Sequence, residues 1–85
     1  MVGILVKSQA LVERLENGFF MVCDEISRQT HIFNSVAFDF WNFCDSVEKK
    51  EAFEFFAEKH GASDRDTEKL IRTLVEKGLL REVEV

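Results

Sequence analysis

Leu11-Val-Glu-Arg-Leu-Glu-Asn-Gly-Phe-Phe-Met-Val-Cys23 is the segment on which a fold prediction can be built. Two runs typical of strands flank Asn17-Gly18. Asn-Gly in that position is the strongest short-range signal for a β-hairpin, because both residues of a two-residue turn must accept a positive φ. Such a turn predicts that Leu15 lies opposite Phe20. It also predicts that one face of the hairpin carries Leu11, Leu15, Phe20 and Val22.

The chain that follows predicts one more strand and then three helices. A polar turn over residues 24–29 leads to a third short strand, Thr30 to Phe33. The expected helices run from Ser35 to about Cys44 after the N-cap Asn34, from Val47 to His60 between Ser46 and Gly61, and from Ser63 or Asp64 to Gly78. The tail, residues 81–85, alternates like an edge strand, or it frays. Strands followed by helices predict a single α+β domain over residues 1–85.

Composition excludes several classes of protein. Apolar residues make up 46% and charged residues 32% of the 85 residues, which is typical of a globular domain. Lys and Arg are outnumbered 11 to 16, so we expect no general affinity for nucleic acid. No run of about 18–20 apolar residues could span a membrane. Cys23 and Cys44 form no CxxC pair, and no signal peptide is recognisable, so we expect a cytoplasmic protein with reduced thiols.

The residues that could carry chemistry are scattered. His31 and His60 lie on different elements, and neither has a metal-ligating residue at ligand spacing. Cys44 has no nearby His and is interpreted as a small core residue. No Gly-rich phosphate loop is present. We therefore expect no enzyme activity, no metal and no cofactor, and a protein that works by binding another polypeptide.

Several motifs taken together resemble a known family. Asn34-Ser-Val-Ala37, Trp41, Cys44-Asp45 and Leu70-Ile-x-x-Leu-x-x-x-Gly-Leu-Leu80 are similar to the PqqD-like proteins. That family is named after the pyrroloquinoline quinone biosynthesis protein D, and its members are also called RiPP recognition elements. The resemblance covers residues 11–80. Two positions depart from the family pattern, because Ser46 stands where the family often has Gly and Thr67 stands where an apolar residue is common.

The resemblance implies a winged-helix-like domain in which a three-stranded antiparallel sheet packs on three helices. It also implies that the leader segment of a ribosomally made precursor peptide docks as an extra strand on the third strand. The domain would then present the peptide to a modifying enzyme, often a radical-SAM protein, and would do no chemistry itself. The expected docking strand is Thr30, His31, Ile32 and Phe33, which contains no Pro or Lys to block its edge.

The third helix is the expected second wall of the peptide groove. If the flank beside Ile71 faces the third strand, Ile71 and Val75 form the groove floor, and Glu68 and Arg72 form a charged rim. The same residues also fit a simpler interpretation, in which the first two belong to the core and the second two form a solvated pair at i,i+4. Sequence alone does not determine which flank faces the strand. The opposite flank offers Lys69, Thr73 and Lys77.

Two other functions remain open on the sequence. A winged-helix DNA-binding transcriptional regulator would use the third helix for recognition, but the charges on that helix cancel. A structural adaptor is the other alternative, and we expect either a monomer or a dimer that swaps a terminal segment. Phe38 and Phe55 lie off the core-facing stripes of their helices. Such a Phe indicates a contact with the sheet, with a dimer partner or with the modifying enzyme.

Overall fold

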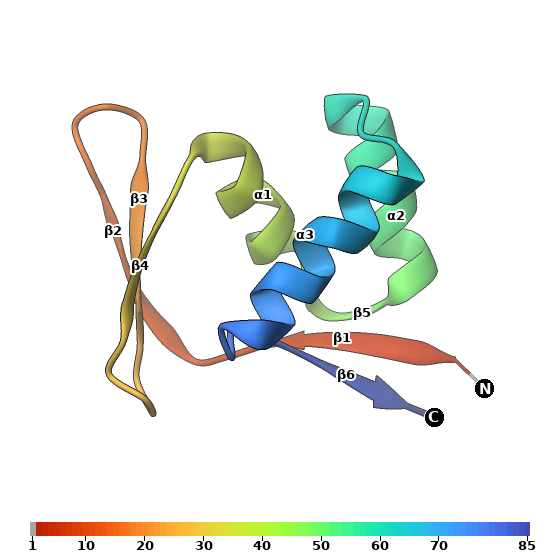
Figure 1. Cartoon of the computed structure of the whole chain (residues 1–85), viewed down its shortest axis with the longest axis horizontal. Coiled ribbons are helices and arrows are strands. Elements are labelled where there is room, and N and C mark those ends of the chain that lie inside the picture. Colours follow the sequence, from red (N-terminus) through yellow and green to blue (C-terminus); the bar gives the residue numbers. More distant parts are fainter. Residues whose placement is uncertain (1) are drawn as a thin grey trace.

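The computed structural model describes residues 2–85, so Met1 of the expected domain lies outside the described part. In chain order the elements are β1 (Gly3–Lys7), β2 (Ala10–Arg14), β3 (Phe20–Asp24), β4 (Thr30–Phe33), α1 (Ser35–Phe43), β5 (Asp45–Glu48), α2 (Lys49–His60), α3 (Asp64–Glu76) and β6 (Leu80–Glu84). The strands form two antiparallel sheets, with orders β2-β3-β4 and β5-β1-β6 (Figure 1). The α+β class is confirmed. The prediction of one three-stranded sheet is incomplete, because a second sheet is present.

The first hairpin forms, but its register differs from the prediction by one residue. Arg14, not Leu15, lies opposite Phe20. The Leu15 amide donates to the Phe19 carbonyl at 2.8 Å, which leaves a three-residue loop in which Gly18 has a φ of +78°. Three-residue hairpin loops commonly end in a residue with a left-handed backbone conformation. Asn17-Gly18 can form this loop as well as the two-residue turn. A shift of one residue moves Leu11 to the exposed outer face of the sheet.

The second sheet is built around β1, which pairs with β5 on one side and β6 on the other. The prediction that Ser46 caps a helix from Val47 is wrong, because Asp45–Glu48 pair with β1 and α2 begins at Lys49. Ser46 has a φ of +61° at an irregularity in the β1–β5 ladder. Ser46 therefore adopts the backbone conformation that favours Gly.

The remaining helix boundaries agree with the sequence prediction. The Asn34 side chain accepts a hydrogen bond from the Ala37 amide at 2.8 Å, and α1 follows. The Ser63 hydroxyl accepts from the Asp66 amide at 3.1 Å and caps α3. Gly61 ends α2 with a φ of +65°. The tail forms β6, which pairs only with β1, so the edge-strand alternative is confirmed.

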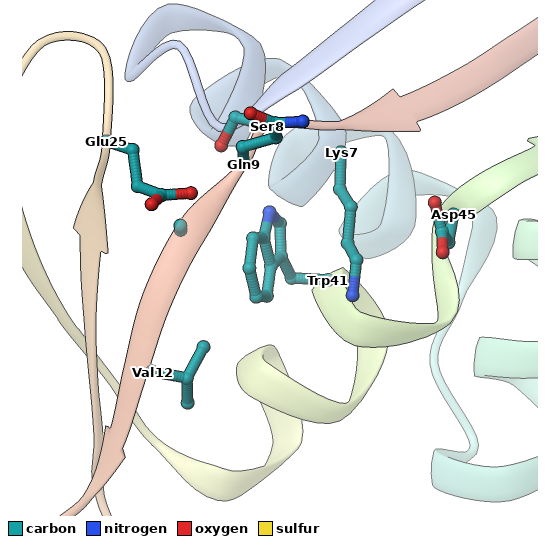
Figure 2. A pocket seen from close by; sticks show the side chains of 8 residues that line it. Lys7, Ser8, Gln9, Val12, Glu25, Trp41 and Asp45 are labelled. Atoms are coloured by element: carbon teal, nitrogen blue, oxygen red, sulfur yellow. The ribbon is translucent and has the colours of Figure 1, made fainter.

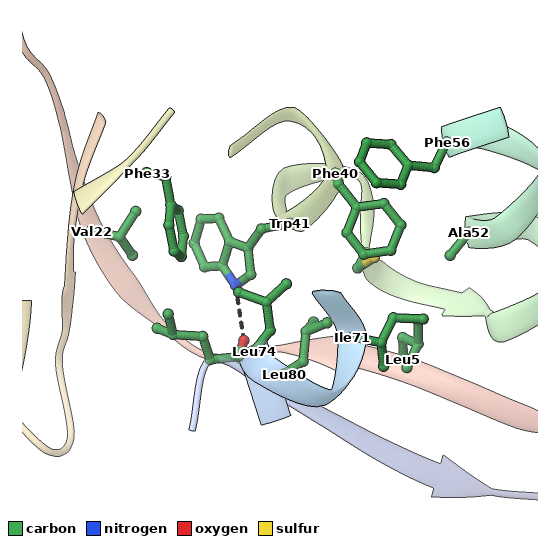
Figure 3. Close-up of a cluster of buried hydrophobic side chains, with 12 residues drawn as sticks. Leu5, Val22, Phe33, Phe40, Trp41, Ala52, Phe56, Ile71, Leu74 and Leu80 are labelled. Carbon is green, nitrogen blue, oxygen red and sulfur yellow. Dashed lines mark hydrogen bonds between the residues drawn. The ribbon is translucent and has the colours of Figure 1, made fainter. Parts of the chain in front are cut away.

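Trp41 on α1 lies at the centre of the buried core and links it to the chain after α3 (Figure 3). Its indole Nε1 donates to the Leu79 carbonyl at 2.8 Å. The two Phe residues that lie off the helix stripes have partners inside the molecule. Phe38 stacks on Phe20 of β3, with ring centroids 3.9 Å apart, and Phe55 stacks on Phe43 of α1 at 4.0 Å. The first stack packs α1 against the β2-β3-β4 sheet, and the second packs α1 against α2.

Candidate functional site

The strand predicted to accept a peptide, β4, forms one edge of its sheet and pairs only with β3. The Asp24 amide donates to the Gln29 carbonyl at 2.9 Å. Hydrogen-bonded and non-bonded pairs alternate along an antiparallel ladder. This bond therefore implies that the N–H and C=O groups of His31 and Phe33 point towards β3. The N–H and C=O groups of Thr30 and Ile32 consequently point towards the open edge. Two residues therefore offer four backbone groups to an added strand.

The side chains of β4 divide between the two faces of the sheet. Phe33 is buried against α1, with its ring centroid 6.3 Å from that of Trp41. His31 is partly buried, and its Nε2 atom has no hydrogen-bond partner among the described residues. Ile32 is 56% exposed on the outer face. An added strand would thus find an apolar side chain beside it on the outer face of the sheet.

The turn that precedes β4 is held by Asp24. Its carboxylate accepts from the Ser27 hydroxyl at 2.7 Å and from the amides of Ser27 and Ile26 at 3.3 and 3.4 Å. The hydrogen bond from the Ser27 side chain is the main reason that the pKa of Asp24 is lower than usual. Arg28 completes the turn with a φ of +65°. The turn fixes the register of β4 on β3.

The four predicted groove residues of α3 lie at i, i+3, i+4 and i+7 on one side of the helix, but only three of them reach its surface. Ile71 is only 2% exposed and belongs to the core, whereas Val75 is 42% exposed. Glu68 lies 3.5 Å from the ammonium of Lys49, at the start of α2. Arg72 lines a surface hollow with Arg65, Glu68 and Lys69.

The orientation of α3 determines which of its flanks faces β4. Lys49 also approaches the Glu82 carboxylate of β6 at 3.4 Å, so the Glu68 flank faces α2 and β6. Leu74 lies beside Trp41, on the side nearer β4, whereas Ile71 points towards Leu5 of β1 (Figure 3). The flank nearer β4 is therefore the one that continues beyond Leu74, towards residues 70, 73 and 77. Thr73 and Lys77 belong to the flank that the sequence left as the alternative, whereas its third residue, Lys69, lines the hollow beside Glu68 and Arg72.

A second open edge was missed by the sequence analysis. The β2 strand pairs only with β3, and a hollow lies between it and α1 (Figure 2). The residues that line this hollow include Lys7, Ala10, Val12, Glu25, Trp41 and Asp45. The apolar run Ile4-Leu5-Val6 before Lys7 could have indicated the strand that brings this lysine to Trp41. Four surface hollows on residues 2–85 are lined by residues outside β4.

Two further titratable groups, Cys44 and Asp39, have pKa values that their surroundings shift. Cys44 is fully buried, and burial raises the pKa of its thiol to about 12. Asp39 accepts from Lys59 and lies against His60 Nε2, each at 2.8 Å. The hydrogen bond from Lys59 is the main reason that the pKa of Asp39 is lowered, and His60 adds to the effect. In the described part of the chain, no group of three His, Cys, Asp or Glu residues could hold a metal ion.

Comparisons with known proteins assign no family. No protein-family model matches the chain, and neither curated proteins nor solved structures give a significant match. Over residues 2–85, none of the helices has the length and apolar character needed to cross a bilayer. The resemblance to the PqqD-like proteins thus depends on the residues quoted above.

Proposed function

We propose that this protein is a PqqD-like domain with a winged-helix-like arrangement, which binds the leader segment of a ribosomally made precursor peptide and presents it to a modifying enzyme. The leader adds a strand to β4. The observation that carries the proposal is the open edge of β4, where no Pro or Lys blocks the approach. The order α1-β5-α2-α3-β6 supports the winged-helix-like arrangement, since one strand separates the first helix from a pair of helices and another strand follows that pair.

Backbone pairing alone does not give this interaction enough affinity. Four hydrogen bonds, each worth about 0.5–1.5 kcal/mol net, contribute about 2–6 kcal/mol. Micromolar binding requires about 8 kcal/mol after the ordering costs. Side chains must supply the difference. The exposed Ile32 on the outer face is one contact, and the flank of α3 beyond Leu74 is the other expected one.

Ile32→Pro tests the proposal. The Ile32 amide points to the open edge, so proline removes a donor for the guest strand and leaves the bonds to β3 intact. We expect the affinity for the leader encoded beside this gene, measured by fluorescence anisotropy, to fall by about tenfold or more. Val12→Pro, which blocks the edge of β2 in the same way, is the matched control and should leave leader affinity unchanged. Equal affinity of wild type and Ile32→Pro would refute leader binding at β4.

A winged-helix DNA-binding regulator is the second candidate, and one observation favours it. Arg65, Lys69 and Arg72 lie together on the exposed side of α3, and none has an ion-pair partner within residues 2–85. Asp64 and Asp66 lie in the first turn of the same helix and would repel a DNA phosphate, which argues against this candidate. Duplex binding whose affinity falls steeply with salt would support this candidate, and its absence at low salt would exclude it.

A further inference from the structure

We infer that the open edge of β2 is a second strand-addition site, which takes an extended segment of a partner polypeptide carrying Lys or Arg side chains. The inference goes beyond the proposed function, because it concerns the opposite edge of the sheet and a different guest. With both edges in use, the β2-β3-β4 sheet would join two polypeptides.

The backbone of β2 offers one more residue to a guest strand than the backbone of β4. The Glu25 amide donates to the Gln9 carbonyl at 3.0 Å, and the Leu15 amide donates to the Phe19 carbonyl at 2.8 Å. Odd-numbered residues of β2 therefore bond to β3, and the N–H and C=O groups of Ala10, Val12 and Arg14 point outward. No backbone hydrogen bond among residues 2–85 engages these three residues from the open side.

A hollow adjoins this edge on the α1 side, which gives an added strand a place for its side chains. Val12 and Val22 lie opposite each other on the face that packs towards α1. Val22 is 0% exposed, but Val12 remains 46% exposed, because the cover that α1 provides ends before the edge of the sheet. Figure 2 shows Val12 and Trp41 on the same side of the β2 strand. Strand addition takes specificity from such recesses for alternate side chains.

The charges around this edge favour a basic guest. Glu13 lies on β2, Glu16 lies in the loop that follows it, and two more carboxylates, Glu25 and Asp45, line the hollow. The nearby cations, Lys7 and Arg14, are fewer, and Lys7 is already engaged. Its ammonium donates to Asn42 Oδ1 at 2.9 Å and lies 4.9 Å from the centre of the Trp41 ring. A guest whose Lys or Arg side chains enter the hollow would pair with Glu25 and Asp45, which have no ion-pair partner within residues 2–85.

A second copy of this chain is a poorer guest. If two β2 strands paired antiparallel about Val12, Glu13 of each strand would lie on the same face as diagonal neighbours. Like charges at that spacing destabilise the pairing. We therefore do not expect dimerisation through β2, and the experiment tests for it by varying the protein concentration.

The test uses the full-length, isotopically labelled protein and two short capped peptides, one of alternating Thr and Lys and one of alternating Thr and Glu. We expect the Lys peptide to shift the amide resonances of Ala10, Val12 and Arg14 and to bind at least about tenfold more tightly than the Glu peptide. Val12→Pro should weaken binding by a similar factor, because its N–H points away from β3 and its loss leaves the sheet intact. Ile32→Pro is the matched control and should leave this affinity within about twofold.

A charge reversal at an exposed position gives a second test that does not depend on proline. Glu25→Lys should weaken binding of the Lys peptide and strengthen binding of the Glu peptide. The inference is overturned if the shifts occur at Thr30 and Ile32, if the two peptides bind equally, or if the β2 shifts depend on protein concentration alone. The leader is proposed to bind at β4. Failure of the leader to bind there would therefore produce none of these three results.

Discussion

Ser46→Gly should stabilise the protein, although glycine usually destabilises a folded chain. Ser46 has a φ of +61° within β5, where the pairing with β1 is irregular. The left-handed conformation costs a non-glycine residue about 1–2 kcal/mol. Glycine offsets part of that gain, because its extra freedom in the unfolded chain costs about 0.5–1 kcal/mol. The net expectation is about 0.5–1 kcal/mol of added stability, or about 2–8 °C in Tm for a domain of this size.

Ser35→Gly provides the matched control for this prediction. Ser35 is also exposed, but it begins α1 with an ordinary helical backbone. The same substitution there should therefore lower stability by about 0.5 kcal/mol. Urea unfolding followed by far-UV circular dichroism measures both changes. If Ser46→Gly lowered the unfolding midpoint as Ser35→Gly does, the backbone strain assigned to Ser46 would be refuted.

Two further predictions concern stability. Trp41→Phe removes the buried hydrogen bond to Leu79 and part of a core ring. It should lower the free energy of unfolding, measured in urea, by about 2 kcal/mol. A decrease of less than about 0.5 kcal/mol would contradict the central role of Trp41 in the core. Asp39 has a lowered pKa in the folded state because of Lys59 and then His60. The unfolded chain therefore takes up the proton first, and the stability from Asp39 is lost as pH falls below about 4. Asp39→Asn should flatten the dependence of Tm on pH in that range, and an unchanged slope would contradict the assignment.

Local signals predicted most of the helix boundaries and the strand that becomes β4. Asn34 and Ser63 cap their helices as expected, since the capping hydrogen bond lies within three residues of the cap. Gly61 ends α2 for a similarly local reason. These features need no knowledge of the rest of the chain.

Two of the three features that were missed depend on contacts between residues far apart in the sequence. The segment 45–48 looks like the start of a helix until β1 pairs with it, and that pairing joins residues about 40 positions apart. The hairpin register was missed because Asn17-Gly18 fits two turn types, and the sequence does not choose between them. The orientation of α3 depends on Lys49 and Glu82, which lie on two other elements.

Amide hydrogen exchange with and without the leader peptide tests the central claim most directly. The amides of Thr30 and Ile32 point to the open edge of β4 in the free protein and should exchange rapidly. Bound leader should slow their exchange by at least about tenfold, because each amide gains a backbone partner. If saturating leader protected other amides and left these two unchanged, the claim that β4 is the docking strand would be contradicted.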